Sequence, residues 1–379
     1  ISDVDGKFSI ITVIPFTSFD ISYIGFTKTR IVLEKNKNYY VVILSQKTAY
    51  LNEVVVPSEN PALAIIRKAI KNKDNNNPQK KLSSFEFKSY NKLIVTANPD
   101  SIDGRIDSVF VQKSFGKQFS KIDSSDYNFK EVIRQQHLFQ TEKVSKYQFA
   151  NARLKETILG TKMSGFKQPV YEIIAFNLQS FSVYDSSYEL FETKYNSPIA
   201  TDALKDYNYK LLDSLIIDGR NTYMIYFKNK KKTRASGLEG VLYIDQNNFA
   251  VAKAVMRIKG VLDISGIHNF KYIPDEKLWF PTDKTFKIVK GKNDDDIKIL
   301  GGTIQFDGDV EEDFKERKKA ASDFTYLLSQ TNNFEIKYNI PMQIKKSVIY
   351  IEIKEDAINK ANADSYVAAY FLAGKLYEY

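Results

Sequence analysis

Two stretches of the sequence have the spacing of a serine acylase, in which a lysine one helical turn away activates a serine hydroxyl. They are Ser89 to Lys92 and Ser114 to Lys117. Serine and lysine are abundant in this chain, and the motifs that accompany Ser-x-x-Lys in such enzymes are missing. We therefore predict that neither serine is a nucleophile. Acidic pairs occur only in charged surface stretches, so no general acid/base dyad is predicted.

The composition leaves few ligands for a metal. The 379 residues include no cysteine and two histidines, His137 and His268, which are expected to be structural. Without cysteine there is no thiol catalysis, no disulfide framework and no cysteine-ligated zinc or iron–sulfur site. Asp294–Asp296 is typical of a solvated turn, and Asp3–Gly6 lacks the remaining ligands of an EF-hand. We predict no metal, no cofactor and no catalytic residue, so the chain is not expected to be an enzyme.

The formal net charge is +9, and it is dispersed except for one cluster. This basic loop, predicted between two strands, contains Lys228, Lys230, Lys231, Lys232 and Arg234. It is either a solvated hairpin loop or a contact for phosphates of lipid headgroups or nucleic acid. No helix-turn-helix, RNA-recognition or zinc-finger pattern accompanies it, so we expect no nucleic-acid partner.

The N-terminal region alternates as short strands. Residues 1–56 have strand runs separated by turns, which predicts a small sandwich. A helix follows, with Asn60 as N-cap, Pro61 at the first position and an apolar stripe of Leu63, Ile66 and Ile70. We interpret residues 57–82 as a helix and linker between domains.

The next regions differ in the clarity of their patterns. Residues 83–206 are predicted as mixed α/β, with a strand from residue 85 and short helices over 125–139 and 146–158. Residues 207–306 consist of strand-like runs that are linked by short turns, which predicts an antiparallel meander. With closing strands at 334–340 and 347–353, the β domain spans 207–358 and includes a charged helix over 309–321. Residues 359–379 are a tail or the start of a membrane barrel, and no run has the ~18–20 apolar residues of a membrane-spanning helix.

A meander of this width is expected to curl into a half-barrel with an apolar concave face. The candidates for that face are Leu238, Val241, Tyr243, Phe249, Val251, Val255, Ile258 and Phe270. Because strand side chains alternate, only about half of them point inward. The face either contacts a ligand or partner, or is a packed core with the C-terminal strands as its lid. The pattern is similar to that of periplasmic lipoprotein carriers, whose half-barrels hold acyl chains.

Three N-terminal stretches, 2–10 (SDVDGKFSI), 21–26 (ISYIGF) and 51–56 (LNEVVV), resemble the carboxypeptidase-regulatory-like domain. That module precedes many TonB-dependent receptors and other outer-membrane proteins. Three further stretches, 61–70 (PALAIIRKAI), 85–92 (FEFKSYNK) and 237–245 (GLEGVLYID), resemble a Gram-negative family of unknown function. In that family the module precedes a long region and a C-terminal outer-membrane barrel. Compared with that pattern, we expect the present sequence to contain only part of the module and little of the barrel.

The resemblance implies a mainly β fold with a few helices (α+β), in which a partial regulatory-like sandwich precedes the half-barrel. It implies an outer-membrane protein whose module faces the periplasm. We expect a non-enzymatic role through contacts with outer-membrane proteins or other envelope subunits, in assembly or transport of envelope components. The alternative is a carrier of lipid or lipoprotein acyl chains on the concave face.

Overall fold

The computed structural model describes residues 8, 16–21, 29–34, 37, 39–45, 60–113, 115–165, 182–190, 193–230, 238–258, 262–290, 297–299, 302–304 and 325–352. Several predictions fall outside these residues. They concern most of the N-terminal sandwich, the helix over 309–321, the tail 359–379, and the turns at Asp3–Gly6 and Asp294–Asp296. Within the described part of 1–56, β1 (Ser18–Ile21) and β2 (Thr29–Val32) form one antiparallel pair.

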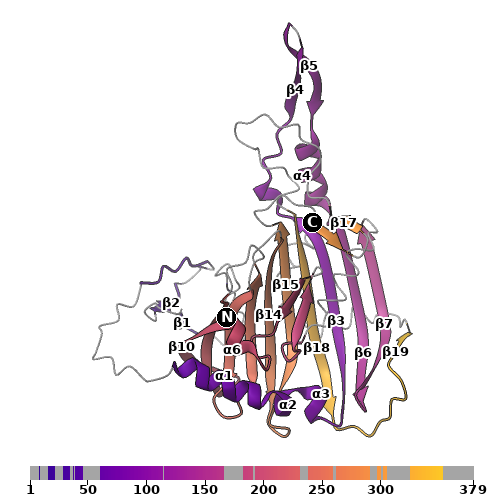
Figure 1. The fold of residues 1–379 in the computed structure, drawn as a ribbon. Coiled ribbons are helices and arrows are strands. Elements are labelled where there is room, and N and C mark those ends of the chain that lie inside the picture. Colours follow the sequence, from indigo (N-terminus) through magenta and orange to yellow (C-terminus); the bar gives the residue numbers. More distant parts are fainter. Residues whose placement is uncertain are drawn as a thin grey trace.

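One large open sheet dominates the structure (Figure 1). Neighbouring strands are antiparallel except for the last pair, β7 and β19, which is parallel. Because β10 and β19 are the two ends of a linear order, the described strands do not close into a barrel. The eleven strands, in spatial order, are β10 (Tyr207–Ile217), β11 (Arg220–Asn229), β12 (Leu238–Asp245), β13 (Val251–Ile258), β14 (Leu262–Ile273), β15 (Leu278–Lys290), β18 (Thr325–Tyr338), β3 (Ser84–Ala97), β6 (Phe139–Ala150), β7 (Arg153–Gly165) and β19 (Val348–Ile351).

The predicted meander is confirmed for β10 to β15, which pair in sequence order. The segment after it differs from the prediction, because β16 (Ile297–Ile299) and β17 (Gly302–Ile304) form a separate two-stranded sheet. The strands predicted at 334–340 and 347–353 do not cover the apolar face as a lid. They belong to the sheet itself, because β18 lies between β15 and β3, and β19 extends the far edge.

Residues 84–165 contribute three strands to the same sheet, so the expected boundary between 83–206 and 207–358 lies within it. The predicted helix over 146–158 is wrong. This stretch contains the end of β6, a two-residue turn and the start of β7. Asn151 and Ala152 both have positive φ, as a two-residue hairpin turn of type I′ requires. Neither glycine nor proline marks this turn, which is why the sequence pattern did not reveal it.

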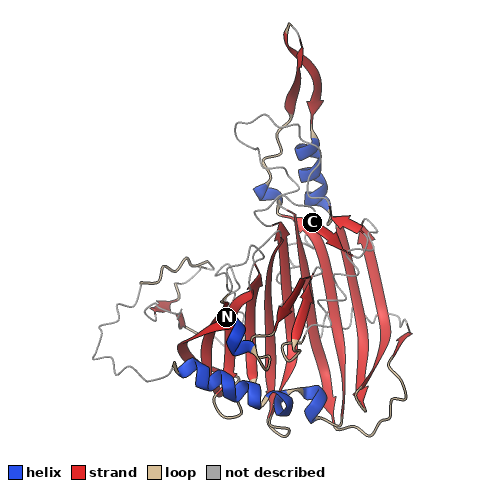
Figure 2. Ribbon diagram, viewed as in Figure 1, coloured by secondary structure: helices blue, strands red, loops and turns tan. Residues whose placement is uncertain are grey.

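Three short helices run along one end of the sheet: α1 (Pro61–Lys71), α2 (Lys73–Asn76) and α3 (Pro78–Lys81) (Figure 2). The predicted cap is confirmed, since Asn60 Oδ1 accepts from the Ala62 amide at 3.0 Å. The Asn60 amide also donates to the carbonyl of Tyr209 at 2.7 Å, which ties the helix start to β10. The helix buries Ala62, Ile65, Ile66 and Ala69 against the sheet. Residues 60–82 are therefore part of the packed core and not only a linker.

Two insertions complete the described fold. The first, between β3 and β6, contains the 3₁₀ turn η1 (Pro99–Ser101), the hairpin β4 (Asp107–Lys113) and β5 (Gly116–Asp123), and helix α4 (Ser125–Gln135). The helix predicted over 125–139 is confirmed from Ser125 to Gln135, while Phe139 already begins β6. The second precedes β10 and contains β8 (Ser187–Leu190), β9 (Thr193–Asn196) and α6 (Ala203–Asp206).

Asp245, at the end of β12, is a fully buried carboxylate that connects three parts of the sheet. It accepts hydrogen bonds from the Arg220 guanidinium, from Trp279 Nε1 at 2.9 Å and from the Asn247 amide at 2.7 Å. The guanidinium also lies over the ring of Tyr272, 4.0 Å from its centroid. Burial opposes ionisation of Asp245, but these donors outweigh it and hold its pKa below the ordinary value.

Asp245→Ala should therefore lower the free energy of unfolding by about 3 kcal/mol, because it leaves the Trp279 and Arg220 donors without their acceptor. Urea unfolding at pH 7 measures this loss. The control is Asp263→Ala, which removes the partner of the half-exposed Arg257, 3.6 Å away. That change should cost less than about 1 kcal/mol. Equal losses in the two variants would contradict a special role for Asp245.

Candidate functional site

The face of the sheet on which α1 packs, here called the helix-bearing face, is apolar across nine of the strands. Its cluster runs from Tyr207 in β10 to Phe139 in β6 and includes α1. Hydrogen-bonded register places its members on one side, because alternate residues of a strand share a face. In the centre it is formed by Leu238, Leu242, Met256, Ile258, Leu262, Ile264, Phe286, Ile288 and Leu327.

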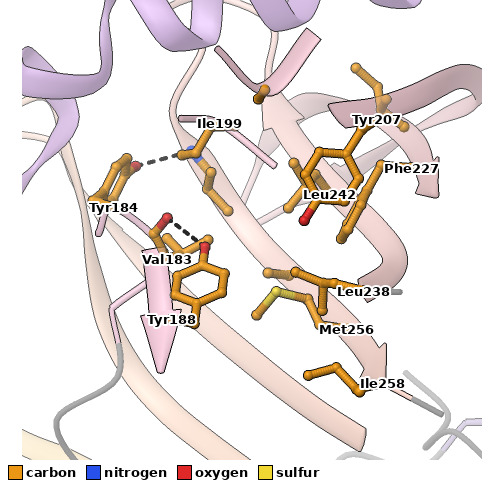
Figure 3. Packing of buried hydrophobic residues seen from close by; sticks show 14 of the residues in the cluster. Val183, Tyr184, Tyr188, Ile199, Tyr207, Phe227, Leu238, Leu242, Met256 and Ile258 are labelled. Atoms are coloured by element: carbon orange, nitrogen blue, oxygen red, sulfur yellow. Dashed lines mark hydrogen bonds between the residues drawn. The ribbon is translucent and has the colours of Figure 1, made fainter. Parts of the chain in front are cut away.

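Residues 182–190 and 193–206, here called the cap segment, cover part of this face. Val183, Tyr184, Tyr188 and Ile199 point into the apolar cluster (Figure 3). Tyrosine hydroxyls hold the segment in place. Tyr184 OH accepts from the Val251 amide at 3.1 Å, and Tyr188 OH donates to the carbonyl of Val183 at 3.0 Å (Figure 3).

Two tyrosines of β10 fasten the same segment from the sheet side. Tyr207 OH donates to the carbonyl of Asn196 at 2.5 Å, and Tyr209 OH donates to that of Pro198 at 2.6 Å. Burial raises the pKa of Tyr207 and Tyr209 far above the usual value, so both remain donors at any physiological pH. The cap segment is thus held by apolar contacts and by tyrosine hydrogen bonds to backbone groups, and not by a layer of regular structure.

His268 and Lys284, here called the buried basic pair, lie opposite each other on β14 and β15 within the helix-bearing face. Both are buried. Burial lowers the pKa of Lys284 to about 8, while Asp185 of the cap segment favours its charged form. Burial, and secondarily Lys284, lowers the pKa of His268 well below its ordinary value. At pH 7 the pair therefore carries one positive charge, on the lysine.

Aromatic rings surround the histidine. The rings of His268 and Phe270 have centroids 4.3 Å apart, and Phe270 makes an edge contact with Tyr184 of the cap segment at 6.3 Å. The ammonium of Lys73, the first residue of α2, donates to the carbonyl of Asp185 at 3.3 Å. A positive charge, an apolar wall and the underside of the cap segment thus meet at one place.

The structure divides the eight residues predicted for the apolar face. Those in the buried cluster are Leu238, Val251, Ile258 and Phe270, while Phe249 packs at its margin, where Lys68 lies over its ring at 4.9 Å. Val241, Tyr243 and Val255 belong to the opposite face, as the pairing of Val241 with Val255 indicates. Contact of the first group with a ligand remains a prediction.

Sequence reasoning missed part of this face. Leu242 and Met256 lie on this face, an even number of residues from Leu238 and Ile258 in the same strands. Period-2 alternation could therefore have identified them from the sequence. Lys284 alternates with Phe286 and Ile288 and could have been found in the same way. The meeting of β14, β15 and the cap segment has no local signal, because it depends on contacts far apart in the sequence.

The opposite face carries its own buried charges. Lys92 and Glu142, on β3 and β6, form an ion pair at 3.5 Å with both side chains buried. Burial lowers the pKa of Lys92 to about 8, although Glu142 favours its charged form. Lys253 is also buried, with a pKa lowered to about 8 by burial, and its ammonium lies 5.7 Å from the ring centroid of Tyr243.

The first Ser-x-x-Lys stretch is a strand, so Ser89 and Lys92 point to opposite faces. The hydroxyl of Ser89 accepts from the Asn91 amide at 3.3 Å, and lysine activation of this serine is excluded. Ser114 of the second stretch lies outside the described residues. His137 Nδ1 is 3.2 Å from the hydroxyl of Thr96, which agrees with a structural role.

The basic loop is only partly described. Lys228 lies 3.4 Å from Glu239 on the adjacent strand, and Lys230 donates to the carbonyl of Leu204 at 2.7 Å. Lys231, Lys232 and Arg234 lie outside the described residues. In the described part of the chain, no group of three or more His, Asp or Glu could hold a metal ion. Among those same residues, no helix has the length and hydropathy of a membrane span.

The titration of Lys284 gives a pH-dependent stability. It loses its proton at a pKa of about 8 in the folded chain and at 10.5 when unfolded. Between these values the unfolded chain binds more protons, so stability rises with pH. The free energy of unfolding of Lys284→Met should therefore rise less between these pH values than that of the natural sequence, by on the order of 3 kcal/mol. Urea unfolding at pH 7.5 and 10.5 measures it, with Lys271→Met at an exposed position as the control. An unchanged rise in Lys284→Met would contradict this account.

Comparisons with known proteins place the sequence in a family. Residues 65–301, more than half of the chain, match the model of a family of unknown function, DUF5686. No curated protein matches the sequence.

Alignments to solved structures are weak. A DUF1329 family protein from Desulfovibrio piger has 8% identity and a TM-score of 0.25, over 75% of this chain and 96% of that one. A putative outer membrane lipoprotein-sorting protein domain from Vibrio parahaemolyticus has 10% identity and a TM-score of 0.26, over 75% and 94%. A LolA superfamily protein from Nitrosomonas europaea has 13% identity and a TM-score of 0.22, over 75% and 96%. TM-scores of this size establish neither a shared fold nor a shared activity.

The family match includes most of α1, β3 and the whole meander from β10 to β15, which together form most of the helix-bearing face. The chain belongs to DUF5686, a family of unknown function.

Proposed function

We propose that this domain is a non-enzymatic carrier that binds an acyl chain with an acidic head on the helix-bearing face, beneath the cap segment. The observation that carries the proposal is the position of the buried basic pair. Lys284 holds a positive charge within an apolar face, under a cover made of short elements. An apolar wall with a charged group placed in it is the arrangement that recognises an amphipathic ligand.

The cap segment is suited to exchange its contacts for those of a ligand. Its regular elements β8, β9 and α6 have four residues each, too short to be stable alone. They are ordered by Tyr184, Tyr188 and the carbonyl contacts to β10. Burying an acyl chain contributes about 0.8 kcal/mol of binding free energy per CH₂. The burial of about ten carbons therefore offsets the loss of the apolar contacts of several cap residues.

The family resemblance supports a place at the outer membrane on its periplasmic side, where lipids and lipoproteins must cross an aqueous space. An open sheet with one apolar face supplies a shelter for an acyl chain during such a crossing. Within this proposal the partners are lipids and the envelope proteins that deliver or receive them.

Paired ligands test the proposal. Laurate and dodecanol, with equal chains, should both displace the fluorescent apolar probe 1-aminoanthracene, and laurate should bind at least tenfold more tightly. Lys284→Met should abolish that preference while retaining dodecanol binding.

The matched control is Lys253→Met, which removes a lysine of similar burial and pKa from the opposite face. It should leave the laurate preference unchanged. If neither ligand displaces the probe from the natural sequence, or if both lysine variants behave alike, the carrier proposal is wrong.

A second candidate, docking of envelope proteins, is favoured by the open edge at β10. No described strand pairs with its outer side, and Ile216 there is 68% exposed. An exposed edge accepts an additional strand from a partner. A photo-reactive residue at position 216, irradiated in native membranes, should link to an outer-membrane protein. A matching residue at exposed Lys271 should not, and equal or absent linking at both positions would count against edge docking.

A further inference from the structure

The insertion between β3 and β6, residues 98–138, is far longer than its connection requires. β3 and β6 are adjacent antiparallel strands, paired from Ser84 with Ala150 to Val95 with Phe139. A turn of two to five residues would join them, and connections beyond about 12–15 residues usually have a function. The insertion projects from the end of the sheet as an arm, with the hairpin of β4 and β5 at its tip (Figure 1).

The base of the arm is packed. Ala97, Ile102 and Ile133 form a buried cluster with Phe129 and Leu138. Lys130 donates to the carbonyl of Ile102 at 2.7 Å, which fixes α4 to the chain leaving β3. The arm is therefore held to the sheet by its own small core, and its tip has a defined direction.

The hairpin itself exposes large apolar side chains. Phe115, at its turn, is fully exposed, and Phe110 and Phe119 form a cross-strand edge contact at 5.9 Å while each is more than half exposed. Ile106 and Ile122 near its base are also more than half exposed. Isolated exposed apolar residues are ordinary, but five on one protruding element form a patch that indicates a binding surface.

The charges of the hairpin identify the kind of surface that matches it. Between Ser108 and Ile122 there are three lysines, Lys113, Lys117 and Lys121, and no acidic residue, while the two acidic residues of the hairpin, Asp107 and Asp123, pair at its base. Lysines beside exposed aromatic rings suit a membrane interface, since the rings enter the headgroup region and the ammonium groups reach the phosphates. A protein partner with an apolar groove would not require lysines without acidic residues beyond the base of the hairpin.

We propose that the tip of this hairpin docks onto an anionic lipid surface, with Phe115 inserted at the headgroup level and the three lysines in contact with lipid phosphates. Insertion is shallow, because the outer edges of a two-stranded hairpin have backbone groups that need water. This inference is independent of the acyl-carrier proposal, since it depends on residues 106–122 and not on the helix-bearing face.

The single tryptophan of the chain makes a direct test possible. Trp279 is fully buried, so a Phe115→Trp variant adds one reporter at the tip. With vesicles of phosphatidylcholine and phosphatidylglycerol the added emission should shift to shorter wavelength, and with pure phosphatidylcholine vesicles the shift should be absent. No shift with anionic vesicles would overturn the proposal.

Vesicle co-sedimentation of the 379-residue chain separates the two contributions. Phe115→Ser should weaken binding at least tenfold, because it removes the inserted ring. Lys113, Lys117 and Lys121 replaced together by Gln should weaken it roughly a hundredfold, at about fivefold per lysine. The folding control is the near-ultraviolet signal of Trp279, which both variants should retain.

Ile349→Ser is the matched control for exposed apolar area, since Ile349 is 56% exposed and belongs to β19, a strand that lies away from the arm (Figure 1). It should bind vesicles like the natural sequence. If Phe115→Ser and the lysine variant also bind unchanged, the arm is not the lipid contact. If the natural sequence does not bind vesicles and the arm cross-links to a protein, the lipid proposal is wrong and the hairpin binds a protein partner.

Discussion

The pairing of β18 with β3 is the constraint on which the rest of the structure depends. These two strands come from opposite parts of the chain, and their register runs from Thr325 with Ala97 to Tyr338 with Phe85. Through this pairing the meander β10–β15 and the strands β3, β6 and β7 become one sheet. Only then is there an apolar face wide enough to need α1 and the cap segment as its cover. Closing so long a loop is entropically expensive, and a long ladder with buried side chains on both faces offsets that cost.

Burial of both faces at the centre of the sheet explains the unusual charges. From Ser89 to Ala97 every residue of β3 is buried, so polar side chains there cannot reach water. Lys92 is stabilised by Glu142 at 3.5 Å, while Lys284 lies opposite His268 on the other face. Buried lysines cost stability when charged, and such residues persist where a charge has a use. On the helix-bearing face the buried Lys284 lies beneath the cap segment, which is why this face is the candidate site.

Sequence patterns predicted the local elements where one signal was sufficient. Asn60 and Pro61 marked the start of α1, and the turns of the meander predicted its antiparallel order. The pattern failed at residues 146–158, since the turn at Asn151 and Ala152 lacks glycine and proline. It also failed to show that β18 lies between β15 and β3, because strand order beyond neighbouring hairpins has no local signature. The arm was predicted only as a short helix, although its exposed Phe115 and three lysines were visible in the sequence.

The sequence by itself determined the predominance of strands, the capped helix, the antiparallel meander and the scarcity of metal ligands, since each depends on residue type and short spacing. The tertiary structure alone decided that the strands of 84–165 join the meander, which side chains share a face, and that His268, Lys284 and the cap segment meet. It also decided that Ser89 and Lys92 point apart. The physical reason is that a strand buries its side chains according to its neighbours and register. The neighbours that join the two halves of the sheet are chosen by contacts far apart in the sequence, such as those between β3 and β18.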